Sequence, residues 1–299
     1  METIEETMRK FKEIFEKARL STVLNIKSVL IVLDENEERE KFLFELVSLL
    51  HDKTGADFTF LLAARGYQSQ AIEVGVKLPT LSGLVDKLKT KFSNYDELFE
   101  VAFIPTTEEK TPFERISELV ARRKVDLVII PVPFTLFAAE ESETEDSLGI
   151  TANKAISETL VNRIPIMLVR STTKLPFADI SVLLRRTTIR NDLIGWLVSF
   201  SEENATINFY YSSRLSHEEI EKVKLYHQVL NIWSKENKKL KIIFKDEPVL
   251  LNEFCEKVCS QQEVLVVFQS TQNVVDDVKD IISSLSFQRE NVLIFPPIE

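Results

Sequence analysis

The sequence is short of the residues from which metal sites and tight ligand-binding turns are usually built. Its 299 residues include only 6 glycines, 2 cysteines and 3 histidines. Cys255 and Cys259 are four apart within a helical pattern, which is neither a CxxC pair nor a disulfide framework. His51, His217 and His227 lie far apart and have no partner at metal-ligand spacing. We therefore expect no metal site, core-facing cysteines and a reducing, cytoplasmic location.

Positive charge and long apolar runs are scarce as well. Lysine and arginine total 37 against 47 aspartates and glutamates, which gives a net charge of −10. Because phosphate affinity depends on clustered basic residues, this balance argues against broad binding to nucleic acid or to anionic membranes. No apolar run approaches the roughly 20 residues that span a bilayer, so membrane insertion is not expected. Residues 1–20 are charged and amphipathic, which predicts a leading helix rather than a secretory signal.

What the chain does contain is a regular alternation of apolar, strand-like runs with amphipathic helical patterns. This alternation is typical of βαβ units and a mainly parallel sheet. The predicted strands of the first half are 28–33, 58–63, 98–104, 125–130 and 165–170. The same order returns in the second half at 179–184, 205–211, 239–244, 263–268 and 291–295.

This repetition predicts two α/β domains, each with a doubly wound, Rossmann-like sheet of five mainly parallel strands. The domains cover residues 21–172 and 178–299, with a linker near 171–177. Helix signals support the order, because the capping box at 216–219 and the glycine at position 55 are typical of helix ends. A further helix is predicted over 247–262, EPVLLNEFCEKVCSQQ.

Two stretches of the first half carry a resemblance to a known family. They are SVLIVLDENEEREKFLFELVSLLHDKTGADFTFLLA at the start, and VDLVIIPVPF with ITANKAISETLVNRIPIMLVR at the end. With the order of elements, they resemble the universal stress protein family in a tandem form with two family domains per chain. The second half resembles the family only through its element order and apolar strands. The resemblance implies that the two halves pair internally as a pseudo-dimer, and it leaves open whether two chains pair again.

Part of this family binds ATP, and the resemblance assigns that site position by position. Asp34 matches an aspartate that ends the first strand near the adenosine, although the residue equally suits a helix N-cap. Ala63 stands where the backbone at the end of the second strand faces the base. Asn153 and Ser157 are the nearest polar candidates for the last phosphate-binding position.

The glycines that wrap the phosphates in ATP-binding members are missing here. Their first two positions fall on Pro131 and Phe134, in the turn expected after the strand at 125–130. Proline has no N–H to donate, and phenylalanine cannot follow a glycine-only backbone path. Losing two or three charge-assisted bonds of roughly 1.5 to 3 kcal/mol each weakens binding by several orders of magnitude. We expect no cofactor, with ATP or another adenine nucleotide in the first domain as the alternative.

In the second half an arginine replaces the aspartate at the end of the first strand. Arg185-Arg186-Thr187-Thr188 follows that strand, where arginines beside hydroxyls suit an anion. A surface turn paired with the acidic body explains the same residues. Both interpretations stay open.

No pattern of residues indicates a nucleophile with its base, so no catalytic residue is predicted. The leading hypothesis is a non-enzymatic stress-response or regulatory protein that acts through contacts with other proteins. The alternative is a sensor for a small ligand, a nucleotide or another anion, in the first domain. Slow ATP hydrolysis, which the resemblance also allows, needs a phosphate site that the sequence does not show.

Overall fold

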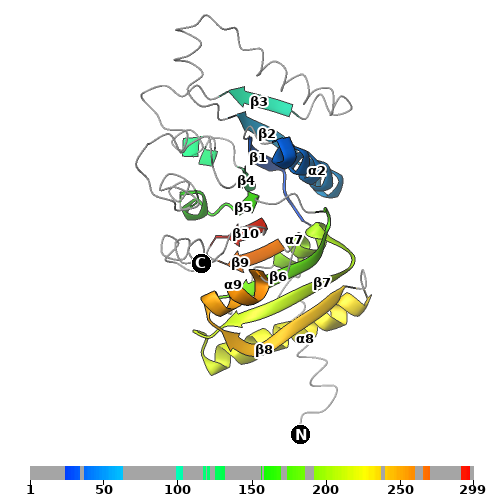
Figure 1. Cartoon of the computed structure of the whole chain (residues 1–299), viewed down its shortest axis with the longest axis vertical. Helices are drawn as coiled ribbons and strands as arrows, with labels where there is room; N and C mark the ends of the chain where they lie inside the picture. Colours follow the sequence, from blue (N-terminus) through cyan, green and yellow to red (C-terminus); the bar gives the residue numbers. More distant parts are fainter. Residues whose placement is uncertain are drawn as a thin grey trace, which may run out of the picture. The chain divides into compact units, whose positions relative to one another are not determined.

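The computed structural model of the chain consists of two compact units (Figure 1). The N-terminal unit is Ile26–Thr172, and the C-terminal unit is Thr173–Glu299 with the residues before Ile26. The predicted leading helix at 1–20 lies outside the residues that the structure describes. Those residues are 24–33, 37–62, 99–103, 117–118, 120–121, 125–131, 156, 158–169, 174–185, 192–236, 240–259, 265–269 and 291–296.

The sheet of the N-terminal unit is parallel, with the strand order β3-β2-β1-β4-β5. Its strands are β1 (Ser28–Leu33), β2 (Asp57–Leu62), β3 (Phe99–Phe103), β4 (Leu127–Pro131) and β5 (Ile166–Val169). β4 and β5 are buried along their whole length, as their continuous apolar sequences require. The chain thus runs outward from β1 to β3 and then returns to the other side of β1.

Helix α2 (Glu37–Thr54) connects β1 to β2. Its apolar stripe, which includes Leu43, Leu46 and Leu50, is buried in the core. The helix ends where Gly55 adopts a positive φ of 65° and donates its N–H to the carbonyl of His51 at 2.8 Å. This left-handed cap is the conformation that the glycine predicted.

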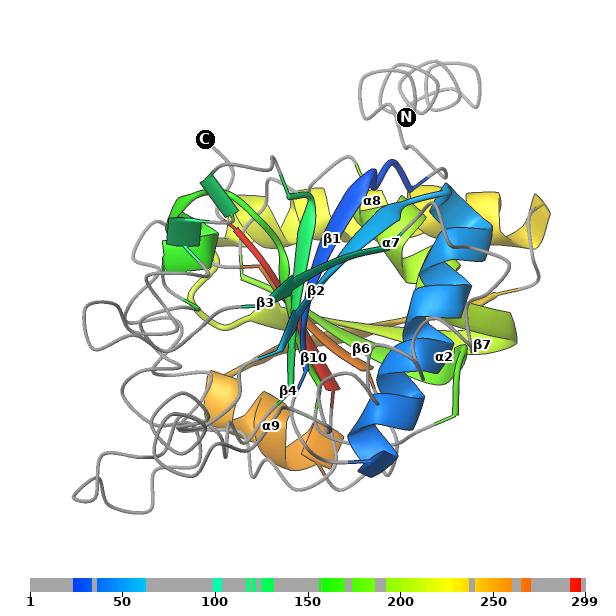
Figure 2. The same ribbon diagram turned by 90° about the horizontal axis from the view of Figure 1, so that it is seen from above.

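The sheet of the C-terminal unit is also parallel, with the order β10-β9-β6-β7-β8. Its strands are β6 (Phe177–Leu184), β7 (Ser201–Ser212), β8 (Lys241–Val249), β9 (Leu265–Gln269) and β10 (Asn291–Phe295). Its helices are α7 (Leu193–Phe200), α8 (His217–Glu236) and α9 (Leu251–Cys259). α8 and α9 lie on opposite faces of this sheet (Figure 2), because the chain reverses direction across the sheet after β8 and crossovers keep one hand. Relative to its first strand, each unit therefore has the same strand order.

Aromatic side chains fill the core of the C-terminal unit. All eight residues of α7 are buried, and the ring of Trp196 meets that of Phe295 edge-on at 5.4 Å. The indole N–H of Trp196 donates a hydrogen bond to the carboxylate of Asp192 at 3.2 Å. On α9, fully buried Phe254 meets Tyr210 of β7 edge-on at 5.0 Å. These rings fix α7 and α9 to the sheet.

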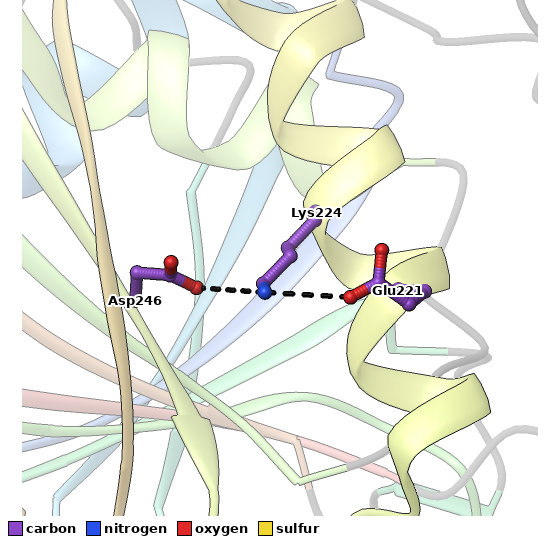
Figure 3. A network of polar contacts seen from close by, with 3 residues as sticks. All are labelled: Glu221, Lys224 and Asp246. Carbon is purple, nitrogen blue, oxygen red and sulfur yellow. Dashed lines mark hydrogen bonds and ion pairs between the residues drawn. The ribbon is translucent and has the colours of Figure 1, made fainter.

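A bulge interrupts the pairing of β7 with β8. Phe209 lies opposite Phe244, but Tyr211 lies opposite Pro248, so residues 245–247 of β8 stand against the single residue Tyr210 of β7. The bulge is tied to α8 by Lys224, whose ammonium lies 3.1 Å from Asp246 and 3.4 Å from Glu221 (Figure 3). The hydrogen bond to Asp246 raises the pKa of Lys224 above its usual value. Beyond the bulge the two strands pair again in a shifted register, with Ser212 opposite Val249.

Most element predictions are confirmed, and the α/β fold with parallel sheets is the one predicted. The capping box of α8 forms, with Ser216 N–H to Glu219 Oε2 at 2.7 Å and Glu219 N–H to Ser216 Oγ at 3.3 Å. Cys255 is buried, as predicted, while the side chain of Cys259 lies outside the described residues.

Several predicted boundaries are wrong, among them the starts of β6 and β7 and the end of β8, and two further cases are the starts of α9 and β4. The helix predicted from Glu247 begins only at Leu251, because β8 continues through Val249. The strand predicted from Val125 begins at Leu127, and just before it the carboxylate of Asp126 accepts the N–H groups of Lys27 and Ser28 at 2.7 and 3.0 Å.

Within the described ranges, no helix combines the length and the apolar character needed to cross a bilayer.

Candidate functional site

The nucleotide-site residues predicted for the N-terminal unit are not described by the structure. Asp34, Ala63, Asn153 and Ser157 all lie outside the described residues. The strand ends before two of them are described: β1 ends at Leu33 and β2 at Leu62, and these two residues pair. The backbone thus brings the positions before Asp34 and Ala63 together at one edge, as expected from a parallel sheet. Their roles stay predictions.

The proline predicted for the turn after β4 lies within the strand. Pro131 is the last residue of β4, is buried, and pairs in register with Val169 of β5. Proline lacks an N–H, but at the last position of a strand no further ladder hydrogen bonds follow. Its ring is therefore accommodated there. The strand thus includes one residue more than the sequence indicated. Phe134 lies outside the described residues.

A pocket lies at the carboxyl ends of three neighbouring strands in the C-terminal unit, with a volume of about 180 Å³. Its described lining comes from Leu183 and Arg185 at the end of β6, from Ser212–Arg214 after β7, and from Leu250–Asn252 at the start of α9. We call it the strand-end pocket. The carboxyl edge of an open parallel sheet is where such folds bind their ligands.

Two arginines give this pocket its charge. Arg185 follows β6 directly and is only 9% exposed, whereas Arg214 is exposed. Removing a guanidinium from water is costly, and its attraction to an opposite charge grows as the surroundings become less polar. A buried guanidinium at the wall of a cavity therefore favours a nearby negative charge, whether from the protein or from a ligand.

Backbone hydrogen bonds, one of them to β8, hold the turn after β7. Ser213 N–H donates to the carbonyl of Val249 at 3.0 Å, and Leu215 N–H donates to that of Ser212 at 3.1 Å. The N–H of Arg214 donates to the hydroxyl oxygen of Ser212 at 3.3 Å. Since this oxygen accepts, the Ser212 hydroxyl proton can be donated elsewhere.

The third wall is the start of α9. Leu250 precedes the helix and accepts its first helical bond, from Phe254 N–H at 2.9 Å. A leucine side chain has no acceptor with which to cap the next N–H groups, which belong to Leu251 and Asn252 at the pocket. Glu253 Oε2 accepts the N–H of Leu250 at 3.1 Å, so one carboxylate lies close by.

Of the three walls of the strand-end pocket, the sequence indicated the one formed by Arg185 but not the other two. Arg185 was recognised because it directly follows an apolar strand, while Arg186, Thr187 and Thr188 lie outside the described residues. The Ser-Ser-Arg run that begins at Ser212 occupies the equivalent place after β7 and satisfies the same rule. The start of α9 could not be found in this way, because its position depends on the bulge in β8.

The described lining offers hydrogen-bond donors and positive charge, which suit ligand binding. In the described part of the chain, no group of three or more histidine, cysteine, aspartate or glutamate side chains could hold a metal ion. That the chain has no catalytic residue stays a prediction.

Comparison with known proteins gives a fold. No family model matches the chain, and no curated protein matches it in sequence. Similar solved structures include a universal stress protein from Archaeoglobus fulgidus DSM 4304, with 9% identity and a TM-score of 0.54 over 93% of this chain and 98% of that one. The cytoplasmic domain of a prokaryotic cation chloride cotransporter has 13% identity and a TM-score of 0.55 over 91% and 96%.

A protein of unknown function from Pseudomonas aeruginosa PAO1 has 13% identity and a TM-score of 0.53 over 91% of this chain and 93% of that one. At such low identity these likenesses concern the fold alone. The chain has a fold similar to that of a universal stress protein.

Proposed function

We propose that the chain is a non-enzymatic stress-response or regulatory protein that acts through contacts with other proteins. In this proposal it is a tandem member of the universal stress group, whose two units derive from a duplication and pair internally. Its cytoplasmic location belongs to the same proposal. The fold similarity and the shared strand order of the two units support it.

One observation carries the proposal that ATP is not used in the family manner. β4 ends in buried Pro131, on which the first glycine position of the ATP-binding members falls. A proline supplies no N–H there, and it fixes the direction in which the chain leaves the sheet. In the C-terminal unit, buried Arg185 stands where those members have an aspartate near the adenosine. A cationic side chain at that position does not replace a carboxylate that accepts hydrogen bonds.

Ligand sensing is the second candidate. The strand-end pocket favours it, although in the C-terminal unit rather than in the first domain, to which the sequence had assigned it. A regulatory protein that acts by contact is compatible with a ligand that biases one of its states.

Equilibrium dialysis of the full, nucleotide-free chain against ATP tests the proposal. We expect no binding at low-micromolar ATP, and no phosphate release from ATP by the same material. Low-micromolar binding, or turnover that is lost when Asp34 is replaced by alanine, would contradict it.

A further inference from the structure

We propose that the strand-end pocket binds a small oxyanion of the size of phosphate or sulfate. The inference concerns the C-terminal unit alone and does not depend on the regulatory role. It rests on the cavity, on a buried arginine in its wall and on a second arginine in its lining.

Arg185 contributes to the pocket lining a guanidinium that is largely withdrawn from solvent. Because the residue is only 9% exposed, solvent screens its guanidinium poorly. A guanidinium also presents paired N–H groups whose geometry matches two oxygens of a phosphate or sulfate. This favours an oxyanion over a halide.

Arg214 and the serine hydroxyls complete the donor set on the second wall. Arg214 leaves the turn after β7, while Ser212 and Ser213 line the same cavity. The Ser212 oxygen already accepts from the backbone N–H of Arg214, so the hydroxyl can act as a donor toward the cavity. Charge and hydroxyl donors from this wall add to those of Arg185.

The start of α9 adds backbone donors from the third wall. α9 has nine residues, and its first N–H groups belong to pocket-lining residues with no acceptor on the preceding Leu250 side chain. The bulge in β8 places Val249 opposite Ser212, which brings this helix start to the cavity. Glu253 Oε2 accepts the N–H of Leu250 at 3.1 Å. Its negative charge lowers the affinity for an anion without filling the pocket.

The size of the cavity limits the ligand. At about 180 Å³ it is smaller than the roughly 300 to 1,000 Å³ of sites that enclose drug-sized molecules. A single phosphate or sulfate group fits this range, either as the free ion or as the end of a larger metabolite. A nucleotide base and sugar would lie outside.

The competing interpretation is an arginine-rich surface turn that is neutralised by the acidic body of the protein. The chain carries a net charge of −10, so such pairing needs no ligand. The two interpretations predict different responses to added anion, and arginine-to-glutamine variants separate them.

The experiment is isothermal titration and thermal unfolding of the full chain with sodium phosphate, against sodium chloride at equal ionic strength. We expect saturable phosphate binding, and an unfolding temperature that rises with phosphate but not with chloride. Arg214→Gln and Arg185→Gln should each weaken binding by about tenfold or more, because each removes charge-assisted hydrogen bonds. Glu253→Gln, which keeps an acceptor for Leu250 N–H, should strengthen it.

Arg163→Gln is the matched control, since Arg163 is exposed and belongs to the N-terminal unit. It should leave the phosphate affinity unchanged. If Arg185→Gln does not fold, phosphate titration of Arg214→Gln and of the charge-preserving Arg185→Lys still tests whether the strand-end pocket binds the anion. Sulfate and AMP serve as further probes: AMP that competes with phosphate indicates recognition of a phosphate group, and weak AMP binding indicates the free ion.

Three results would overturn the proposal. They are no phosphate or sulfate binding beyond the chloride control, equal phosphate binding by wild type, Arg185→Gln and Arg214→Gln, and binding of AMP by a protein that ignores inorganic phosphate.

Discussion

The two units have the same strand order around their first strand, but the residues at their strand ends differ. In the N-terminal unit β4 ends in a buried proline, and in the C-terminal unit β6 is followed by a buried arginine. β2 spans six residues, whereas its counterpart β7 spans twelve and leads into the Ser-Ser-Arg turn of the pocket. The apolar patterns that set the strand order are thus separable from the few residues that give each sheet edge its chemistry.

The largest expected effect comes from breaking the core under the strand-end pocket. Phe254→Ala removes a fully buried ring that fixes α9 against Tyr210, and should lower the free energy of unfolding by about 3 to 5 kcal/mol. Because α9 forms one wall of the pocket, phosphate binding should be lost as well. Chemical denaturation and phosphate titration measure the two effects.

Leu46→Ala provides the comparison in the other unit. Leu46 is fully buried on α2, so its truncation should cost about 2 to 5 kcal/mol. We expect phosphate affinity to stay as in the wild type. If Leu46→Ala abolished binding while Phe254→Ala preserved it, the assignment of the pocket to the C-terminal unit would be wrong.

A smaller effect is expected from pH, and it concerns the C-terminal unit. Burial lowers the pKa of His227 below its usual value of 6.5, while a hydrogen bond to the backbone of Ile242 opposes this shift. The ring stacks on Phe244 at 4.9 Å, and Asn231 Nδ2 donates to its Nε2 at 2.8 Å. The folded state therefore favours the neutral ring.

The sign of the pH effect follows from this preference. Above about pH 6.5 the ring is neutral in both the folded and the unfolded chain, and His227 adds no pH dependence. As the pH falls through 6.5 the unfolded chain binds the proton first, so stability is lost until the folded-state pKa is passed, by at most about 1.4 kcal/mol per pH unit. His227→Gln should be less stable at pH 8, because it loses the ring, but its unfolding free energy should fall less between pH 7 and 5. An unchanged slope would show that other groups cause the loss.

The smallest effect is expected at the β8 bulge. Lys224 pairs with Asp246 and Glu221 at the surface, where water and salt screen the charges. A double-mutant cycle of Lys224→Ala and Asp246→Ala should give a weak favourable coupling that disappears at 1 M salt. A coupling that persists at that salt concentration would mean that the bulge depends on this pair more than its exposure suggests.

The fold was more predictable than the site, for physical reasons that particular elements illustrate. β1 and β10 match their predicted bounds, because each is a polar residue followed by an uninterrupted apolar run that stops at an aspartate or a proline. The continuation of β8 through Lys245–Val249 has no such pattern, and it exists because β7 pairs with it beyond the bulge. α7 is apolar on all sides, so it has no stripe by which its helical period can be recognised.

The pocket required the same kind of non-local information. Arg185 could be placed at the sheet edge from the sequence, since it directly follows β6. Arg214 and the start of α9 meet it only after three parallel strands and a bulge have been aligned. Sequence distance gives no hint that residues near 185, 213 and 251 line one cavity.

The stoichiometry of phosphate binding to the full chain tests the contrast between the units most directly. Isothermal titration should give one phosphate per chain in the wild type and much weaker binding in the Arg214→Gln variant. Two equivalent phosphates per chain would mean that the N-terminal unit keeps a site of its own, and binding that survives Arg214→Gln unchanged would place the anion outside the strand-end pocket. Either result would contradict the account.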